Sequence, residues 1–423
     1  MTSIYLSASK RWTPTSEADI QAALDQGLIG ESHHLDLKEF PAGKGDNKEA
    51  ARDMASFAID GGALIYGIAE DKENRSFYRK PGPLNGMAEK LEQVARSLCD
   101  PPLTLTTEEI PSACDPTQGY VIVHIPASST APHMVDGRYY GRGDKTKHPL
   151  PDPEVVRLHE RRRAADRDAL ALLQAEIDTD PIPAEIRRQA HLFLVAQPLA
   201  GREDMLLDLV SGPNWNLDMG GFLNQAFTSE VNTAVKGIDG KPSLSDAHRG
   251  FRRAGGAARA TPNLGDGRVF DPSVSYHAED AVELRVHEDG GLRVFMSRFS
   301  DTWPNGEEQI ILDQAAVSYT RRFLALVLAA AERAGYFGNW ALAFGATGLR
   351  GHHANNQGNI LGFEDLARYD QDDYRRATAA TWAELNQMPG TITRALIGAL
   401  LRALGTEGRY TDILTSPEAT TEA

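Results

Sequence analysis

The segment GGALIYGIAED, which begins at Gly61, places the strongest constraint on the fold. Its apolar run from Ala63 to Ala69 lacks the polar/apolar alternation of a half-exposed strand, and such a run is typical of a strand buried on both faces. Just upstream, KEAARDMASFAID has apolar residues at helical spacing and ends at a glycine pair. This order predicts an α/β fold in which the strand is central in its sheet.

A second short strand carries ionisable groups in the sequence GESHHLDLKEF, which begins at Gly30. Side chains alternate along a strand, so two leucines face one way while Asp36 and Lys38 face the other. Glu31 precedes Asp36 by five positions, an odd separation that places it on the wrong face of a continuous strand. A turn near Gly30 and Ser32 would correct this. The two acids could then converge on one metal ion.

The remaining patterns predict a sheet flanked by helices in the N-terminal part, with helices at about residues 17–27, 84–98 and 153–177 and strands in TLTTEEI and GYVIVHIPAS. The C-terminal part is expected to be α+β. It contains a strand in HLFLVAQPL, a hairpin around the Asp-Gly-Gly of AVELRVHEDGGLRVFMSR, a long helix in DQAAVSYTRRFLALVLAAAERAGY, a strand in NWALAFGATGL, and one or two helices within residues 372–405.

The break DTDPIP near residue 180 marks a domain boundary. We therefore expect an N-terminal domain at residues 1–163 that includes the first helix, and a helical connector at residues 164–183. An α+β domain of unknown role then follows at residues 184–412, and residues 413–423 form a disordered tail.

Composition indicates a soluble globular protein, with 41% hydrophobic and 24% charged residues in 423. No apolar stretch reaches the roughly 20 residues that span a bilayer, and the N-terminus lacks the apolar core of a signal peptide. We expect a cytoplasmic location and no membrane partner. Cys99 and Cys114 are the only cysteines, too few for a disulfide framework or a cysteine-rich zinc site.

The formal net charge of −15 argues against nonspecific binding of polyanions by the whole molecule. Residues 1–163 carry 20 Lys and Arg against 24 Asp and Glu, a net charge of −4, and the remainder carries −11. Within the N-terminal part, however, basic residues cluster with tyrosines, a combination that can hold phosphates and stack bases. An ordinary solvated surface is the alternative. The candidate nucleic-acid-binding residues are Arg75, Arg79, Lys80, Arg138, Tyr140, Arg142, Lys145 and Lys147.

The order ESHHLDLKEF, ASFAIDGGALIYGIAED, YVIVHIPAS and GRYYGRGDKTKHPLPDPEVVRLHERR resembles the Schlafen AlbA-like domain, also called a divergent AAA or DNA-binding domain. The resemblance covers about residues 15–163. Two positions depart from the family pattern: Ile59 stands where Asn is usual, and Asp36 replaces the commoner Glu. The matching positions are Glu31, Ser32, Asp36, Leu37, Lys38, Gly61, Gly62 and Asp71.

In nuclease-active Schlafen relatives, three carboxylates form a site that cuts RNA, including transfer RNA. The resemblance implies that Glu31, Asp36 and Asp71 are catalytic and bind Mg²⁺ or Mn²⁺, hard cations that prefer oxygen ligands. Lys38 would be catalytic by stabilising charge on the phosphorane. Each residue also has an ordinary alternative: Glu31 could cap a turn, Asp36 and Lys38 could form a surface ion pair worth under about 1 kcal/mol, and Asp71 could begin a loop.

No G-x-x-x-x-G-K-[ST] motif occurs, so the sequence predicts no ATP site despite the divergent AAA name. Our first hypothesis is a metal-dependent ribonuclease, a toxin or defence effector, whose C-terminal domain binds a protein or ligand. The alternatives are a non-catalytic nucleic-acid-binding regulator and an assembly subunit that uses the domain for dimerisation. Schlafen cores pair two related lobes and this chain has one recognisable lobe, so we also expect a homodimer.

Overall fold

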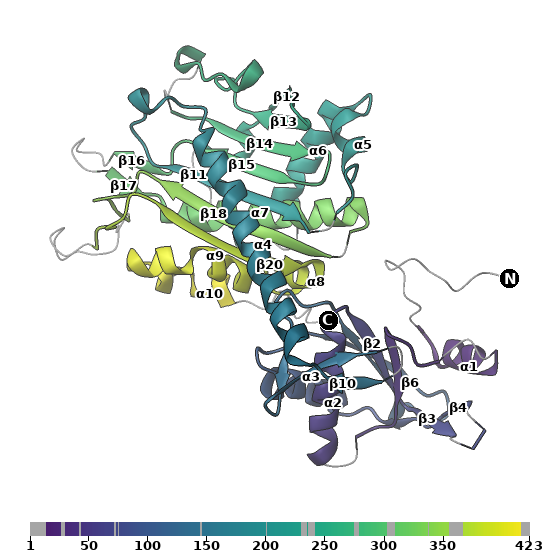
Figure 1. The fold of residues 1–423 in the computed structure, drawn as a ribbon. Helices are drawn as coiled ribbons and strands as arrows, with labels where there is room; N and C mark the ends of the chain where they lie inside the picture. Colours follow the sequence, from purple (N-terminus) through teal and green to yellow (C-terminus); the bar gives the residue numbers. More distant parts are fainter. Residues whose placement is uncertain are drawn as a thin grey trace. The chain divides into compact units, whose positions relative to one another are not determined.

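The computed structural model divides the chain into two compact units, Met1–Arg163 and Ala164–Ala423 (Figure 1). Helix α4, Asp152–Asp178, begins in the first unit and ends in the second, so most of the expected connector is a continuation of this helix. The structure describes residues 14–26, 30–41, 44–71, 73–74, 76–143, 146–199, 201–229, 235, 242–274, 279–302, 309–336, 338–354 and 367–415.

The N-terminal unit is built on a five-stranded mixed sheet in which β1, β2, β7 and β5 are neighbours in that order and β6 also pairs with β7. Strands β1 and β2 are parallel, and β2 and β7 are antiparallel. Two smaller sheets, β10-β9-β8 and β3-β4, complete the unit. The elements are α1 Glu17–Asp25, β1 Leu35–Lys38, α2 Lys44–Phe57, β2 Gly62–Tyr66, β3 Ile68–Asp71, β4 Ser76–Arg79, β5 Gly82–Pro83, α3 Met87–Leu98, β6 Thr106–Pro111, β7 Gln118–Ile125, β8 Met134–Val135, β9 Arg138–Arg142 and β10 Lys147–Pro149.

Strand β2 is central in its sheet and buried on both faces, as its apolar run predicts. Leu64 packs in one cluster with residues of α2 and α3, including Met54 and Leu91. Ile65 packs in a second cluster on the opposite face, together with Ile20 of α1. Two apolar layers therefore hold β2, and through its parallel pairing they hold β1 in place.

Three glycines shape the ends of β2. Gly61, directly before β2, has a left-handed φ of 74°. Gly62 has no room for a side chain, since a Cβ there would lie 2.1 Å from Cδ1 of Phe57. Gly67, with φ 104°, ends β2 two residues before the end of the predicted strand. The chain then enters the β3–β4 hairpin, whose strands pair only with each other among the described strands.

The C-terminal unit contains a seven-stranded antiparallel sheet of order β12-β13-β14-β15-β11-β18-β20 and a small sheet of order β16-β17-β19. The unit confirms the predicted α+β fold. Its elements are η1 Ala184–Ile186, β11 His191–Pro198, α5 Leu207–Ser211, α6 Trp215–Thr228, η3 Leu244–Asp246, β12 Arg249–Arg253, β13 Gly256–Ala260, η4 Asp266–Arg268, η5 Pro272–Val274, β14 Val282–His287, β15 Leu292–Met296, β16 Ser300–Thr302, β17 Gln309–Ile311, α7 Asp313–Ala334, β18 Asn339–Thr347, β19 His353–Ala354, β20 Tyr374–Thr381, α8 Trp382–Gln387, α9 Pro389–Ala403, η7 Glu407–Tyr410 and α10 Thr411–Thr415.

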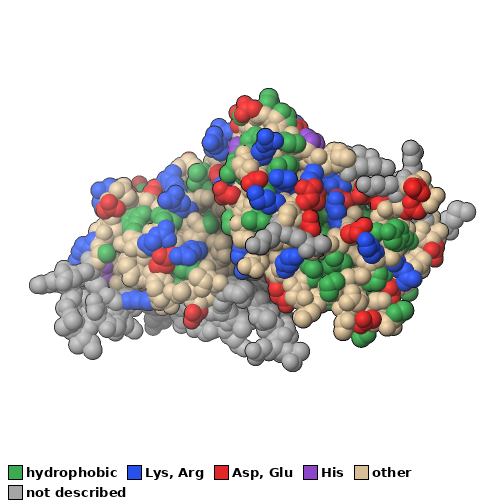
Figure 2. All heavy atoms as spheres, turned by 90° about the horizontal axis from the view of Figure 1, so that it is seen from below, with side chains coloured by type: hydrophobic (Ala, Val, Ile, Leu, Met, Phe, Trp, Pro, Cys, Tyr) green, Lys and Arg blue, Asp and Glu red, His purple; other side chains and the backbone are tan. Residues whose placement is uncertain are grey.

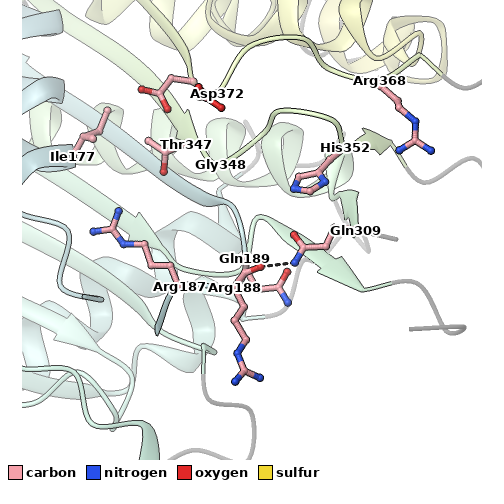
Figure 3. A pocket seen from close by; sticks show the side chains of 11 residues that line it. Ile177, Arg187, Arg188, Gln189, Gln309, Thr347, Gly348, His352, Arg368 and Asp372 are labelled. Atoms are coloured by element: carbon pink, nitrogen blue, oxygen red, sulfur yellow. Dashed lines mark hydrogen bonds between the residues drawn. The ribbon is translucent and has the colours of Figure 1, made fainter. Parts of the chain in front are cut away.

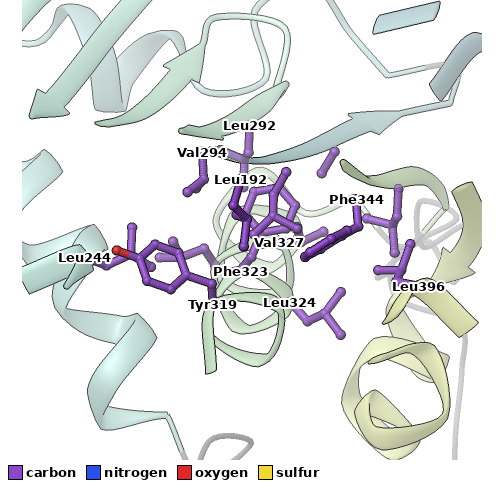
Figure 4. Packing of buried hydrophobic residues seen from close by; sticks show 14 of the residues in the cluster. Leu192, Leu244, Leu292, Val294, Tyr319, Phe323, Leu324, Val327, Phe344 and Leu396 are labelled. Carbon is purple, nitrogen blue, oxygen red and sulfur yellow. The ribbon is translucent and has the colours of Figure 1, made fainter. Parts of the chain in front are cut away.

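Successive side chains of β11 point alternately into two apolar layers of this unit. Leu192 belongs to the larger core, in which Phe323 and Val327 of α7 pack against the sheet (Figure 4). Phe193 belongs to a smaller core on the opposite face, where it meets Leu173 of α4. Figure 1 shows α4 crossing this face of the sheet. Helices thus pack on both faces of this sheet.

Two expectations for the C-terminal part differ from the structure. Residues 372–405, expected to form one or two helices, also include β20, whose eight residues pair with β18. Residues 413–415, expected to open the disordered tail, lie in α10, where Ile413 and Leu414 are buried. Residues 416–423 lie outside the described residues. Among the helices that the structure describes, none combines the length and apolar character needed to cross a membrane.

Candidate active site

Asp36 and Lys38 lie together on the polar side of β1. Leu37 points the other way, into the apolar cluster that contains Ile65. Asp36 is only 2% exposed, and its Oδ2 lies 3.1 Å from Nζ of Lys38, whose side chain is 31% exposed. Alternation in one short strand therefore brings a buried carboxylate beside a half-buried ammonium.

Arg142 of β9 is the second cation on Asp36. Its Nη1 donates to Oδ2 of Asp36 at 2.9 Å, and its Nε donates to the carbonyl oxygen of Ser32 at 3.1 Å. The guanidinium also stacks on Phe57, 4.3 Å from the centre of the ring. Only 2% of the Arg142 side chain is exposed. Arg142, predicted as a nucleic-acid contact, is thus placed inside the unit, where it neutralises Asp36.

Asp53 of α2 supplies another buried carboxylate. Its Oδ2 lies 3.6 Å from Nζ of Lys38, and its Oδ1 accepts a hydrogen bond from Nζ of Lys147 at 2.6 Å. Burial raises the pKa of Asp53, while the charges of Lys38 and Lys147 act against that rise. Burial alone would lower the pKa of Lys38, but the charges of Asp53 and Asp36 outweigh burial and raise this pKa, so Lys38 is protonated.

Sequence reasoning missed Asp53. The sequence feature that could have identified Asp53 is its position in the apolar part of a predicted helix. It directly precedes Met54 and Ala55, which are both fully buried. An acid at such a position needs a cation partner, because a buried unpaired charge is costly. The partner Lys147 lies 94 positions away in the sequence, which no local pattern indicates.

Glu31 reaches Asp36 through a tight turn. The backbone N–H of Ser32 donates to the carbonyl oxygen of Leu35 at 2.8 Å, which folds the chain back just before β1. Burial, together with the hydrogen bond and charge of Asp36, raises the pKa of Glu31 to about 7, whereas Lys38 and Arg142 act in the opposite direction. Two acids of the predicted set, Glu31 and Asp36, are therefore brought together with Lys38.

We call Glu31, Asp36, Asp53, Lys38, Arg142 and Lys147 the Asp36 cluster.

Asp71, the third predicted carboxylate, is placed at the turn of the β3–β4 hairpin. Its Oδ2 accepts from Nδ2 of Asn74 at 2.7 Å, and its Oδ1 accepts from the backbone N–H groups of Glu73 and Asn74. These hydrogen bonds lower the pKa of Asp71. The geometry assigns this carboxylate to its own turn.

Other predicted nucleic-acid contacts have intramolecular partners. Nη1 of Arg79 lies 3.0 Å from Oε1 of Glu17, and Lys80 pairs with Glu39. Lys147 lies 2.5 Å from Oε1 of Glu49 in addition to its bond with Asp53.

Tyr140 is buried beneath the guanidinium of Arg52, which lies 5.6 Å from the ring centre. Arg138 is exposed on β9. Arg75 and Lys145 lie outside the described residues. On the face drawn in Figure 2, Lys and Arg side chains are interspersed with Asp and Glu. Among its described residues, this face therefore carries small groups of cations and no extended basic surface.

The carboxylates of the Asp36 cluster offer few free oxygens that could bind a divalent cation. Among the described residues, no group of three or more His, Cys, Asp or Glu side chains could hold a metal ion. Asp53 is already bonded to two lysines. Oδ1 of Asp36, by contrast, is buried and accepts no hydrogen bond from the described part of the chain. An unpartnered carboxylate oxygen of this kind can ligate a divalent cation, since Mg²⁺ is commonly bound through one or two carboxylates plus substrate phosphates.

The N-terminal unit is thus a mixed α/β unit with a buried cluster of acids and cations at β1. Residues 31–151 match the family model described as Schlafen, AlbA_2. The family model covers the Asp36 cluster completely.

Two solved structures are similar to this chain over about a third of its length. The crystal structure of the DIP2311 protein from Corynebacterium diphtheriae is 20% identical, with a TM-score of 0.23, and the match covers 32% of this chain and 26% of that protein. The solution structure of the N-terminal domain of a protein described as related to the ATP-dependent DNA helicase RecG, from Nitrosomonas europaea, is 18% identical with a TM-score of 0.24. That match covers 31% of this chain and 90% of the domain. No curated protein matches the chain.

Proposed function

We propose that the N-terminal unit binds RNA and hydrolyses its phosphodiester bonds at the Asp36 cluster. The observation that carries this proposal is the convergence of Glu31 and Asp36 beside Lys38, three residues of the Schlafen AlbA_2 match. Glu31 and Lys38 are both partly exposed, so a phosphate group can approach them from solvent.

The cluster offers a proton acceptor and a cation for this reaction. Glu31, with a pKa of about 7, can take the proton of an attacking water near neutral pH. The water oxygen forms a bond to phosphorus while one P–O ester bond breaks. Lys38 stabilises the charge on the phosphorane and gives a proton to the leaving oxygen. Lys38 then recovers a proton from solvent, and Glu31 releases to solvent the proton that it took. Mg²⁺ or Mn²⁺, if held by Oδ1 of Asp36 together with phosphate oxygens of the substrate, would polarise the phosphate.

Arg142 and Lys147 have supporting roles in this scheme. They neutralise Asp36 and Asp53, so the acids of the cluster do not repel the substrate as strongly as bare carboxylates would. Cations for the RNA backbone come from elsewhere on the unit. Arg138 on β9 is exposed, and Arg157, Arg161 and Arg163 are exposed on α4.

The first test is a cleavage assay of the purified full-length chain on transfer RNA, single-stranded RNA and DNA, with and without Mn²⁺. Glu31→Gln removes the proton acceptor and keeps the side-chain volume, so we expect at least a 100-fold loss of RNA cleavage with retained RNA binding. Asp71→Asn is the matched carboxamide control and should cleave normally. If Asp71→Asn abolishes cleavage, Asp71 reaches the substrate as the resemblance implies, and the two-carboxylate site is wrong.

A non-catalytic RNA-binding role is the second candidate. It is favoured by the charge balance of the Asp36 cluster, in which Asp36 and Asp53 are already paired with Arg142, Lys38 and Lys147. Binding that weakens with salt but is never followed by Mn²⁺-dependent cleavage would select this candidate. A chain that binds no nucleic acid would instead favour the role of an assembly subunit.

A further inference from the structure

A polar cleft opens at one end of the seven-stranded sheet in the C-terminal unit (Figure 3). The sheet brings its walls together, because His191 at the start of β11 pairs with Thr347 at the end of β18. The cleft volume is about 780 Å³, within the roughly 300–1,000 Å³ of small-molecule sites. Its lining includes Arg187, Arg188, Gln189, Thr347, His352 and Arg368.

Both acids of the lining are neutralised by arginines outside it. Asp372 accepts two hydrogen bonds from Arg350, at 2.9 and 3.1 Å. Asp373 accepts one from Arg375 at 2.6 Å. The cleft therefore offers few unpaired acceptors to a ligand, although two carboxylates lie at its edge.

Among the arginines of the lining, Arg188 supplies a positive charge that no described acid pairs with. Nη1 of Arg187 lies 3.3 Å from Asp180, and Nη1 of Arg368 donates to the carbonyl oxygen of Gly351 at 2.9 Å. The exposed guanidinium of Arg188 makes no hydrogen bond or ion pair with the residues that the structure describes. Burial raises the pKa of Glu279, and the charge of Arg188 is among the influences that oppose this rise. Figure 3 shows Arg187, Arg188 and Arg368 at separate positions around the lining.

The neutral side chains of the lining add further donors. Ser300 lies 2.9 Å from Oε1 of Gln189, which turns the carbonyl end of this amide toward Ser300 and leaves its NH₂ group to donate elsewhere. Burial, His353 and Arg368 lower the pKa of His352, so its imidazole is neutral at pH 7 and can donate one hydrogen bond. Thr347 contributes a hydroxyl.

We propose that this cleft binds a phosphate-bearing small molecule of the size and chemistry of a nucleoside diphosphate. Arginine guanidinium groups, an amide and an imidazole complement the oxygens of a diphosphate, and guanidinium–phosphate bonds are strong because both partners are charged. The volume also exceeds the space that a single phosphate group needs, which leaves room for a nucleoside. This proposal does not depend on the proposed RNA cleavage, since every residue that it uses lies in the C-terminal unit.

The test is calorimetric titration of the full-length chain with ADP, pyrophosphate and adenosine at 50 and 200 mM salt. We expect ADP to bind more tightly than pyrophosphate, and we expect both to bind more weakly at the higher salt concentration. Arg188→Glu and Arg368→Glu should each weaken ADP binding at least tenfold. The matched control Arg202→Glu changes an arginine that is 72% exposed and absent from the lining, and should bind as the wild type does.

ADP binding by the C-terminal unit can be tested independently of RNA cleavage by the N-terminal unit. Glu31→Gln should bind ADP with unchanged affinity, whether or not the chain cuts RNA. Absence of binding of both ADP and pyrophosphate at millimolar concentration would overturn the proposal. Equal ADP affinity in Arg188→Glu and the wild type, or adenosine binding as tight as that of ADP, would overturn it as well.

Discussion

Asp36→Asn should destabilise the N-terminal unit, because it leaves a buried guanidinium without its counter-charge. The side chains of Asp36 and Arg142 are 3% and 2% exposed, and their atoms are 2.9 Å apart. Breaking a buried ion pair on one side typically costs about 3–5 kcal/mol. Two features of this variant reduce that cost. Asn keeps an oxygen acceptor for Arg142, and its NH₂ group can donate to Glu31 where two carboxyl groups now repel. We therefore expect a loss of about 2–3 kcal/mol.

Hydrogen exchange of the full-length chain can measure this loss within the N-terminal unit. Peptides that cover β1, β2 and β7 report opening of the sheet that carries Asp36. A loss of about 2–3 kcal/mol corresponds to exchange roughly 30 to 150 times faster, since about 1.4 kcal/mol is a factor of ten. Asp71→Asn, which changes an exposed carboxylate at a hairpin turn, should alter exchange in β1 less than threefold.

A paired replacement tests the cause of the loss. Asp36→Leu combined with Arg142→Met removes both buried charges, and such replacements are often neutral or stabilising. Protection of β1 should then recover most of its wild-type value. The reasoning fails if Asp36→Asn exchanges like the wild type, or if the double variant is no better protected than Asp36→Asn alone.

Because Asp36→Asn is expected to destabilise the N-terminal unit, it is a poor variant for testing catalysis. The sequence alone suggests that Asp36→Asn removes a metal ligand and leaves folding intact. The buried pair with Arg142 means that lost cleavage in this variant could follow from lost structure. Glu31 is partly exposed and has no cation within hydrogen-bonding distance among the described residues, so Glu31→Gln is the cleaner probe of chemistry.

Three further predictions concern stability and assembly. Because the pKa of Glu31 is raised from 4.5 to about 7, its contribution to stability is complete below about pH 4.5 and is lost as the pH rises to about 7. After discounting for solvent exposure, the loss should be about 1 kcal/mol, and exchange measured across this range should show it in the wild type but not in Glu31→Gln. Gly62→Ala should cost about 1–3 kcal/mol, since its Cβ would lie 2.1 Å from Phe57 and 2.9 Å from the carbonyl oxygen of His34. Gly45→Ala, in an open helical position, should be neutral or stabilising in the same thermal unfolding scan. Light scattering should give about twice the 46.1 kDa chain mass if the expected homodimer forms, and a monomer at micromolar concentration would contradict it.

Local patterns predicted the N-terminal fold well, because hydrophobic periodicity acts over a few residues. The central position of β2 and the alternation of β1 both follow from that periodicity. The location of Asp71 did not follow, since it depends on a break at Gly67. Ala63 to Ala69 form one apolar run in the sequence, but the positive φ of Gly67 divides the run and sends its acidic end into a separate hairpin.

Strand β20 shows where tertiary pairing overrides local preference. Its sequence YRRATAAT is rich in alanine and arginine, which favour helices. Pairing with all but the last residue of β18 instead holds it as the edge strand, and Tyr374 packs into the larger core. Such non-local pairing is not visible in a single sequence. The same limit explains why the partners of Arg142 and Lys147, about 100 residues away, could not be anticipated.

The distribution of cations within the Asp36 cluster makes Glu31 the residue on which the proposed cleavage depends. Asp36 is paired with Arg142 and Lys38, and Asp53 is paired with Lys147. These carboxylates are fixed by bonds that a substrate would have to break before either could take a proton. Glu31 is held mainly by burial and by its neighbour Asp36, which raise its pKa to about 7. It can therefore gain or lose a proton near neutral pH while the rest of the cluster keeps its structure. If the domain is catalytic, the proton that moves should be the one on Glu31; if cleavage survives in Glu31→Gln, another group takes the proton and the role proposed for Glu31 is wrong.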